Sequence, residues 1–170
     1  MTGNEEMITE DVANYVESSV LCWLATVSED GVPNVSPKEA FLLDDNGRIL
    51  VANIASPETV RNIRHSCKVC LSFVNVFIQK GYKITGDARI LTEGDAGYAE
   101  GLAKLVSKIG DTFSILSIIE IQPSQVDPIV APSYRIFPDS TEVDRIGESL
   151  DSYAVKHYQD QAAREEPDTR

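Results

Sequence analysis

Short apolar runs, separated by turn-forming residues, fill most of this chain and predict a protein built mainly from β-strands. The turns Glu29-Asp30-Gly31 and Asp44-Asp45-Asn46-Gly47 lie between such runs and predict two successive hairpins. Alternating or β-branched apolar residues predict strands at 21–28, 32–43, 48–54, 69–77, 82–91 and 113–121, with a further edge strand at 126–136.

Three stretches interrupt this pattern with helical spacing. A first helix is expected over Ile8–Ser18, with Thr9 as its N-cap and acidic residues in its first turn. Pro57–His65 is preceded by Ser56 as N-cap and has proline at the first helical position. Asp95–Ile109 carries apolar residues on one face and is expected to stop at Gly110.

The order of these elements predicts a mainly β fold with accessory helices. Antiparallel strands of this number favour a six-stranded split barrel, because closing the sheet removes exposed edges. One domain is expected at 1–138, since 170 residues suit a single hydrophobic core. Residues 139–170 are polar and acidic, and they are expected to form either a surface helix or a disordered tail.

Charge changes the picture in two places. The net charge is −12, with five acids and no bases in 1–17 and nine acids against four bases in 139–170, so nucleic acid is not expected as a partner. The stretch 61–89 is basic instead, which suggests a small anionic ligand, although ordinary surface charge remains the alternative. Its charged residues are Arg61, Arg64, Lys68, Lys80, Lys83 and Arg89 against Asp87.

Neither the cysteines nor any known catalytic motif points to metal or hydrolytic chemistry. Cys22, Cys67 and Cys70 are too few for a disulfide framework, and the Cys67–Cys70 pair is expected to serve packing, with no zinc site. No apolar run is long enough to span a membrane and no basic-then-apolar leader is seen, so a cytoplasmic protein is expected. Redox chemistry on a bound cofactor needs no such motif, because the cofactor carries the electrons.

Three segments, in order, give the chain a specific resemblance. They are V-P-N-V-S-P-K (Val32–Lys38), I-L-V-A-N-I-A-S-P-E-T-V-R-N-I-R (Ile49–Arg64) and K-V-C-L-S-F-V-N-V-F-I-Q-K-G-Y-K-I-T-G-D-A-R (Lys68–Arg89). Together they resemble the pyridoxamine 5′-phosphate oxidase-like, FMN-binding split-barrel family, and its smaller general members more than the vitamin B6 enzyme. The resemblance spans about residues 10–122 and implies a split barrel of Greek-key type.

The resemblance also implies a flavin site. A phosphate would meet an N-capped helix start, whose first N–H groups are free. The expected cofactor is FMN, held at the interface of a homodimer. By resemblance, four parts of the chain contact the flavin. One face of the second strand does so through Ser36, Pro37 and Lys38, and the end of the third strand through Val51, Ala52 and Asn53. The following loop and helix contribute Ser56 and Thr59, and a later strand contributes Gln79, Lys80 and Lys83.

Two departures limit what the resemblance implies. Many relatives have a basic residue after the serine of the phosphate loop, whereas this chain reads Pro57-Glu58-Thr59, so another cation is required. Trp23 is the only tryptophan, and the late tryptophan of the vitamin B6 oxidase is missing. The expected function is therefore an FMN-dependent oxidoreductase that moves hydride between a nicotinamide or similar donor and a small organic substrate. A non-catalytic protein that binds flavin, deazaflavin F420 or haem is the alternative.

Overall fold

The computed structural model describes residues 7–155 and 157–158. The chain divides into two compact units, which are described separately below. The first comprises Met1–Val74 and Gly81–Pro128, and the second comprises Asn75–Lys80 and Ile129–Arg170.

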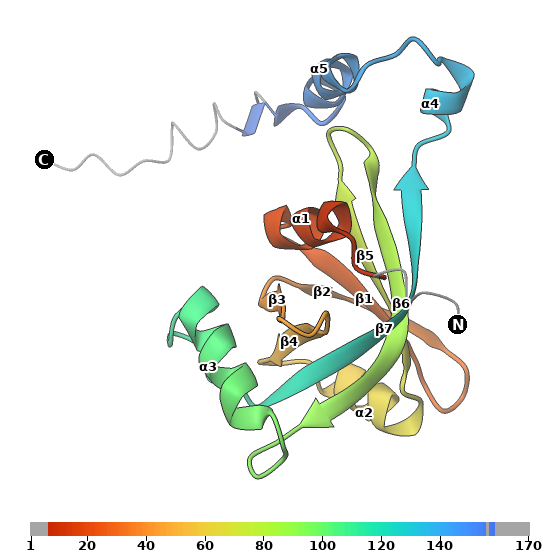
Figure 1. Ribbon diagram of the computed structural model, residues 1–170. Coiled ribbons are helices and arrows are strands. Elements are labelled where there is room, and N and C mark those ends of the chain that lie inside the picture. The colour runs from red at the N-terminus through yellow and green to blue at the C-terminus, as the bar shows by residue number, and fades with distance from the viewer. Residues whose placement is uncertain (1–6, 156, 159–170) are drawn as a thin grey trace, which may run out of the picture. The chain divides into compact units, whose positions relative to one another are not determined.

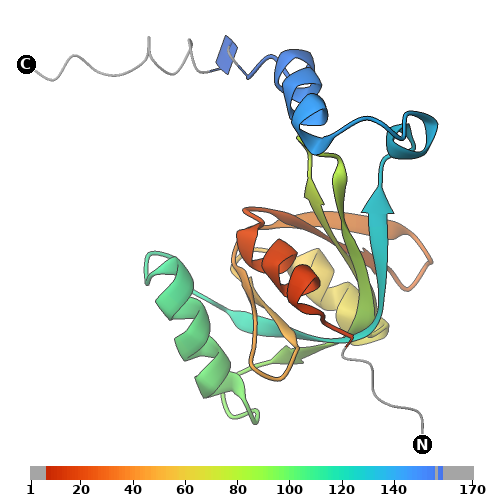
Figure 2. The ribbon, with the colours of Figure 1, turned by 45° about the horizontal axis from the view of Figure 1, so that its top comes forward.

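A single seven-stranded sheet is the main feature of the structure (Figure 1). In the first unit it forms a curled half-barrel, which Figure 2 shows from above, and this confirms the predicted antiparallel split barrel. The order is β2-β1-β5-β6-β7-β4-β3. The strands are β1 (Cys22–Val27), β2 (Pro33–Lys38), β3 (Phe41–Leu43), β4 (Ile49–Asn53), β5 (Lys68–Asn75), β6 (Lys80–Leu91) and β7 (Ser117–Val130).

Three strand predictions differ from the structure. The strand expected at 113–121 begins only at Ser117, as the start of β7. The run 32–43 forms two strands, since pairing with β1 ends at Lys38 and pairing with β4 begins at Phe41, which gives seven strands instead of six. The expected edge strand at 126–136 is not separate, because β7 continues without a break to Val130. Pro33 and Pro37 both lie in β2, an end strand of the sheet, where a missing N–H costs no interior ladder bond.

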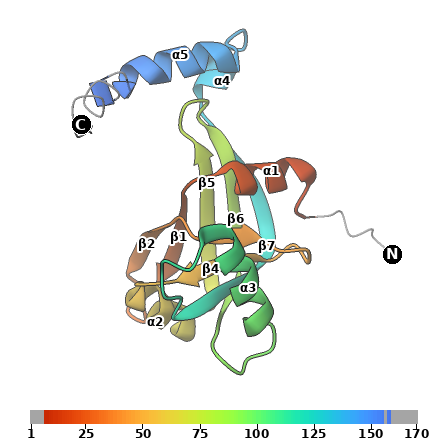
Figure 3. The ribbon, with the colours of Figure 1, turned by 90° about the vertical axis from the view of Figure 1, so that its left-hand side faces the viewer.

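Helices α1 (Glu10–Ser18), α2 (Pro57–His65) and α3 (Tyr98–Ile109) confirm the three predicted helices. Thr9 caps α1 by accepting a hydrogen bond from the Val12 N–H at 3.4 Å. α3 starts later than expected, because Asp95 accepts bonds from the N–H and hydroxyl of Thr92 and closes a separate turn. α1 packs near β3, α2 against β1, and α3 beside β3 and β4 (Figure 3).

The core of the first unit has two parts. One lies inside the curl of the sheet, where Val12 and Val16 of α1 meet Ile63 of α2 and apolar strand residues. The other joins Leu105 of α3 to Leu50 of β4 and their apolar neighbours. Burying these side chains fixes α2 and α3 on the sheet, and the residues at the ends of both helices are placed as a result.

The second unit contains helices α4 (Ser133–Ile136) and α5 (Glu142–Ser152), together with the residues between β5 and β6. Thr141 and Asp144 form a capping box at the start of α5. Ser149 donates from its hydroxyl to the Phe77 carbonyl at 2.9 Å. α5 thus occupies part of the segment for which a surface helix was one of two expectations, while 159–170 lie outside the described residues.

Gly86 of β6 lies at a close approach of two strands, and this gives a stability prediction. A Cβ added there would lie 2.4 Å from the Gln122 carbonyl oxygen, so we expect Gly86→Ala to lower the free energy of unfolding by about 1–3 kcal/mol. Gly147 of α5 has open space at the same position, and Gly147→Ala should instead stabilise by about 0.5–1 kcal/mol. Urea titration of both variants measures this, and equal effects would contradict the close packing of β6 on β7.

Candidate functional site

Two adjoining pockets form the candidate site, and both belong to the first unit. The apolar pocket has a volume of about 470 Å³, and most of its walls are alanine, isoleucine and phenylalanine side chains. Such a size and lining suit a small organic ring system. Its residues are Pro37, Lys38, Glu39, Ala40, Ala52, Ile54, Ala55, Ser56, Ile109 and Phe113.

The second pocket, here called the arginine pocket, is cationic. It has a volume of about 420 Å³ and contains Arg61 and Arg64, one turn apart on α2, with no carboxylate in its lining. Ala55 and Ser56 line both pockets, so the two adjoin at the start of α2. Its residues are Asn53, Ala55, Ser56, Pro57, Val60, Arg61, Arg64 and Leu116.

The junction between β4 and α2 is held in place by Asn53, the last residue of β4. Its Oδ1 accepts a hydrogen bond from the Ser56 N–H at 3.1 Å, and its Nδ2 donates to the Ser117 hydroxyl at 2.8 Å. Pro57 then begins the helix with φ already suited to it. The Ser56 side chain makes no cap hydrogen bond, and its oxygen accepts a hydrogen bond from a lysine instead.

That lysine is Lys38, which lies at the end of β2 and is only 6 % exposed. Its Nζ donates to the Ser36 hydroxyl at 2.7 Å and to the Ser56 hydroxyl at 2.5 Å. Burial lowers the pKa of the Lys38 ammonium. Cys22 is its partner across β1 and β2, but burial raises the pKa of that thiol to about 12, so the thiol supplies no negative charge at neutral pH. Among the described residues Lys38 has no carboxylate partner, and a buried cation of this kind favours binding of an anion.

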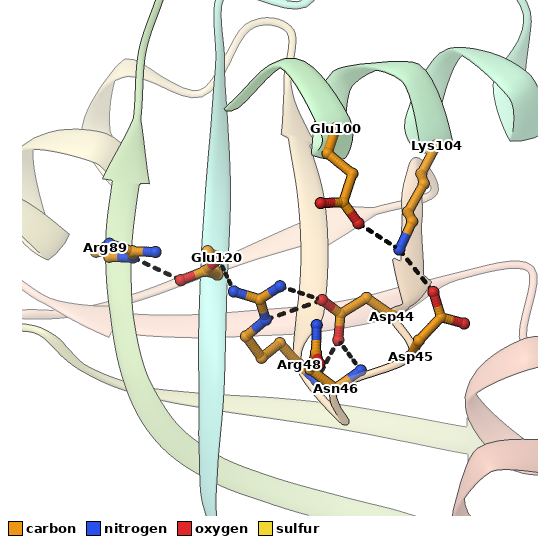
Figure 4. Close-up of polar contacts among 8 residues, drawn as sticks. All are labelled: Asp44, Asp45, Asn46, Arg48, Arg89, Glu100, Lys104 and Glu120. Carbon is orange, nitrogen blue, oxygen red and sulfur yellow. Dashed lines mark hydrogen bonds and ion pairs between the residues drawn. The ribbon is translucent and has the colours of Figure 1, made fainter. Parts of the chain in front are cut away.

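Most of the basic charge in 61–89 is neutralised by acids, three of which lie far away in sequence. Figure 4 shows one of these pairs, in which Arg89 Nε contacts Glu120 at 2.5 Å. Within the described part of the chain, Arg61 and Arg64 are the two bases of this stretch that make no ion pair. The other pairs are Lys68 with Asp87, Lys80 with Glu142 and Lys83 with Asp127. The uniform positive stretch suggested by the sequence is therefore reduced to one arginine pair.

The structure brings about half of the predicted site residues to these pockets. Those that line a pocket or bond directly to one that does are Ser36, Pro37, Lys38, Ala52, Asn53 and Ser56. Val51 is fully buried in the core and Thr59 is 1 % exposed, so neither side chain lines a pocket. Lys83 is paired with Asp127, and Gln79 and Lys80 belong to the second unit.

Other residues of the pockets were not predicted. Ile109 and Phe113 come from the end of α3 and the loop after it, and no local motif connects them with the strands they approach. Arg61 and Arg64 were visible as basic residues, yet their spacing is equally typical of a solvated helix face. Glu58, which is unfavourable near a phosphate, lines neither pocket.

Comparison with known proteins identifies the family. A sequence model described as pyridoxamine 5′-phosphate oxidase matches residues 8–133, which is most of the chain. The chain belongs to the pyridoxamine 5′-phosphate oxidase family. An uncharacterized protein of Methanocaldococcus jannaschii is 33 % identical over 90 residues, which cover 52 % of this chain and 59 % of that relative. The chain thus matches little more than half the length of this curated relative.

Solved structures of other proteins share the fold. HupZ of Group A Streptococcus is 26 % identical, with a TM-score of 0.61, over 71 % of this chain and 92 % of that one. An FMN-binding protein of Syntrophomonas wolfei is 11 % identical, with a TM-score of 0.62, over 72 % and 86 %. HutZ of Vibrio cholerae, described as a haem storage protein, is 18 % identical, with a TM-score of 0.57, over 72 % and 94 %. Proteins of this fold therefore include both FMN-binding and haem-storing members.

Three further features of the described residues concern membrane-spanning helices, metal-binding groups and the cysteines. No helix in the described ranges is long and apolar enough to cross a membrane. In the same ranges no group of three or more histidine, cysteine or acidic side chains is placed to hold a metal ion. The three cysteines are all free, and Cys67 donates from its thiol to Asp87, which raises the pKa of that thiol.

Proposed function

We propose that this protein binds FMN across the two pockets and acts as an FMN-dependent oxidoreductase. One observation carries the proposal: an apolar pocket and a carboxylate-free arginine pocket adjoin at Ser56, which lines both. FMN has the same division, with a flat apolar ring at one end and a phosphate at the other. The resemblance of the sequence to FMN-binding proteins supports the same cofactor.

The arginine pocket suits the phosphate. Arg61 and Arg64 supply two cations, and charge-assisted hydrogen bonds from arginine are among the strongest that phosphate accepts. The first helical hydrogen bond of α2 runs from the Val60 N–H to the Ser56 carbonyl. The N–H groups of Glu58 and Thr59 precede that bond, so the helix start adds further donors. These arginines replace the basic residue that the phosphate loop lacks.

The apolar pocket suits the ring. Ala40, Ala52 and Ile54 leave a wide wall without polar groups, while Phe113 lies at the edge and is 56 % exposed. Lys38 is the cation that lines this pocket. A bound flavin would supply hydride acceptance and donation, and negative charge that develops on its ring is stabilised by a nearby buried ammonium. The chain's own contribution is then to orient the ring, exclude water and place this charge.

Titration of the purified protein with FMN and with riboflavin tests the proposal. FMN differs from riboflavin by the phosphate alone, so we expect FMN to bind at least about tenfold more tightly, because charged hydrogen bonds contribute about 1.5–3 kcal/mol each. Quenching of flavin fluorescence measures both affinities. Equal affinities would remove the phosphate assignment.

Anaerobic mixing of the FMN-loaded protein with NADH or NADPH then separates an enzyme from a binding protein. Loss of flavin absorbance on the timescale of turnover supports an oxidoreductase that accepts hydride from a nicotinamide. A protein that binds FMN but is not reduced by either donor is a flavin carrier. Failure to bind FMN, together with binding of F420 or haem, would show that the site binds one of those ligands instead.

We further propose that the protein is a homodimer with the flavin at its interface. The outward face of β1 and β2 is apolar and exposed, with Trp23 at 46 %, Val27 at 41 % and Val35 at 58 % exposure. Trp23 lies beside Pro37 across the strands, and Pro37 lines the apolar pocket. A second copy seated on this face would therefore close one side of the pocket.

Light scattering is expected to give twice the chain mass. Val35→Glu places a charge in the centre of this face and should shift the protein to monomer. Val143→Glu adds the same charge to an exposed valine of α5 and should leave the dimer intact. A monomeric wild-type protein that still binds FMN would rule out this arrangement.

A further inference from the structure

A third pocket adjoins the arginine pocket at Arg64 of α2. It has a volume of about 330 Å³, and Arg64 lines both this pocket and the arginine pocket. Its residues are Ile63, Arg64, Ala88, Arg89, Ile90 and Thr92. It is here called the Arg89 pocket.

Two arginines, Arg64 and Arg89, line the Arg89 pocket, and the carboxylate of Asp95 lies next to it on Thr92. No carboxylate lines it, although the protein carries a net charge of −12. Arg89 contacts Glu120 through Nε (Figure 4), and among the described residues its two terminal nitrogens make no hydrogen bond. Glu120 also accepts from Arg48, which in turn pairs with Asp44, so the charges of these two arginines are balanced by two carboxylates. The terminal nitrogens of Arg89 nevertheless remain available as hydrogen-bond donors to a ligand.

Three arginines thus lie along two adjoining pockets: Arg61, then Arg64, then Arg89. A single phosphate in the arginine pocket uses the first two and leaves the Arg89 pocket without an anion. Carboxylate-free walls in so acidic a chain favour a ligand with more than one anionic group.

We infer that the two pockets together bind a ligand with two linked anionic groups, of the diphosphate class. One anionic group lies between Arg61 and Arg64, and the second lies between Arg64 and the terminal nitrogens of Arg89. The inference rests on the proposed phosphate site, since it shares Arg61 and Arg64 with it. It adds that a diphosphate-bearing molecule, such as a dinucleotide, is a ligand of this surface.

Calorimetric titration with inorganic phosphate and with pyrophosphate, both without divalent cations, tests the inference. We expect the wild-type protein to bind pyrophosphate about tenfold or more tightly than phosphate, because a second anionic group gains its own charged hydrogen bonds. Arg89→Gln should reduce this preference to about threefold or less, while the affinities for phosphate and FMN stay unchanged. Arg89→Lys, which keeps the positive charge, should retain most of the preference.

Arg135→Gln serves as the matched control, because it removes one exposed positive charge from α4 in the second unit. The pyrophosphate preference should survive in this variant. Equal binding of phosphate and pyrophosphate by the wild type, or equal loss of preference in Arg89→Gln and Arg135→Gln, would overturn the inference. FMN binding without a pyrophosphate preference would reject this inference and leave the proposed function unaffected. Pyrophosphate binding without FMN binding would reject the proposed function instead.

Discussion

The double variant Arg61→Gln/Arg64→Gln is expected to weaken FMN binding by about a hundredfold while changing riboflavin binding by less than about threefold. Each arginine contributes a charged hydrogen bond of about 1.5–3 kcal/mol to the phosphate, and riboflavin has no phosphate to lose. Both side chains point outward from α2, so the fold should be unaffected. Fluorescence titration with the two flavins at the same ionic strength measures the change.

The matched control is Lys108→Gln/Arg135→Gln, which also removes two exposed positive charges but from α3 and α4. It should leave both affinities near those of the wild type, because neither residue lines the arginine pocket or the apolar pocket. Equal losses in the two double variants would show that general electrostatic attraction, and not the arginine pocket, holds the phosphate. Equal weakening of FMN and riboflavin would show that α2 contacts the ring instead.

The variant Asp44→Ala is expected to lower the free energy of unfolding by about 3–5 kcal/mol, the usual cost of breaking a buried ion pair. The Asp44 side chain is 1 % exposed and pairs with Arg48 at 2.6 Å. It also accepts hydrogen bonds from the N–H groups of Asn46 and Arg48, which close the turn between β3 and β4 (Figure 4). Urea denaturation measures the loss. Asp45→Ala is the control, since this neighbour is exposed and should cost less than about 1 kcal/mol.

Lowering the pH should reproduce part of this loss of stability. Burial raises the pKa of Asp44, but hydrogen bonds from the Arg48 side chain and from two backbone N–H groups outweigh it and hold the pKa below 3.8. A carboxyl with a lowered folded-state pKa stabilises the protein fully above its unfolded pKa and loses that contribution as the pH falls further. The stability difference between wild type and Asp44→Ala should therefore shrink as the pH falls below 3.8. A difference that is constant with pH would show that the turn, and not the charge, is what Asp44 stabilises.

Local sequence determined much of this protein. Proline at position 57 predicted where α2 begins, because its restricted φ acts locally, although the Ser56 side chain makes no cap hydrogen bond. The apolar runs predicted the strands, since burial of one or both faces is encoded in each run. Where prediction failed, at residues 39–40, the strand changes partner from β1 to β4. Such an exchange depends on which strands are neighbours in space, and a single run contains no such information.

The candidate site likewise combines residues predicted from local sequence with features that depend on tertiary structure. Ser36, Pro37, Lys38, Ala52, Asn53 and Ser56 were identified from ordered segments of sequence, and the structure places them at the pockets. The charge of the site was decided only by tertiary structure. Glu120, Asp127 and Glu142 neutralise Arg89, Lys83 and Lys80 from at least 31 positions away along the chain. Which base keeps its charge for a ligand depends on distances of a few ångströms between strands, because ion pairing is a short-range contact that chain folding creates.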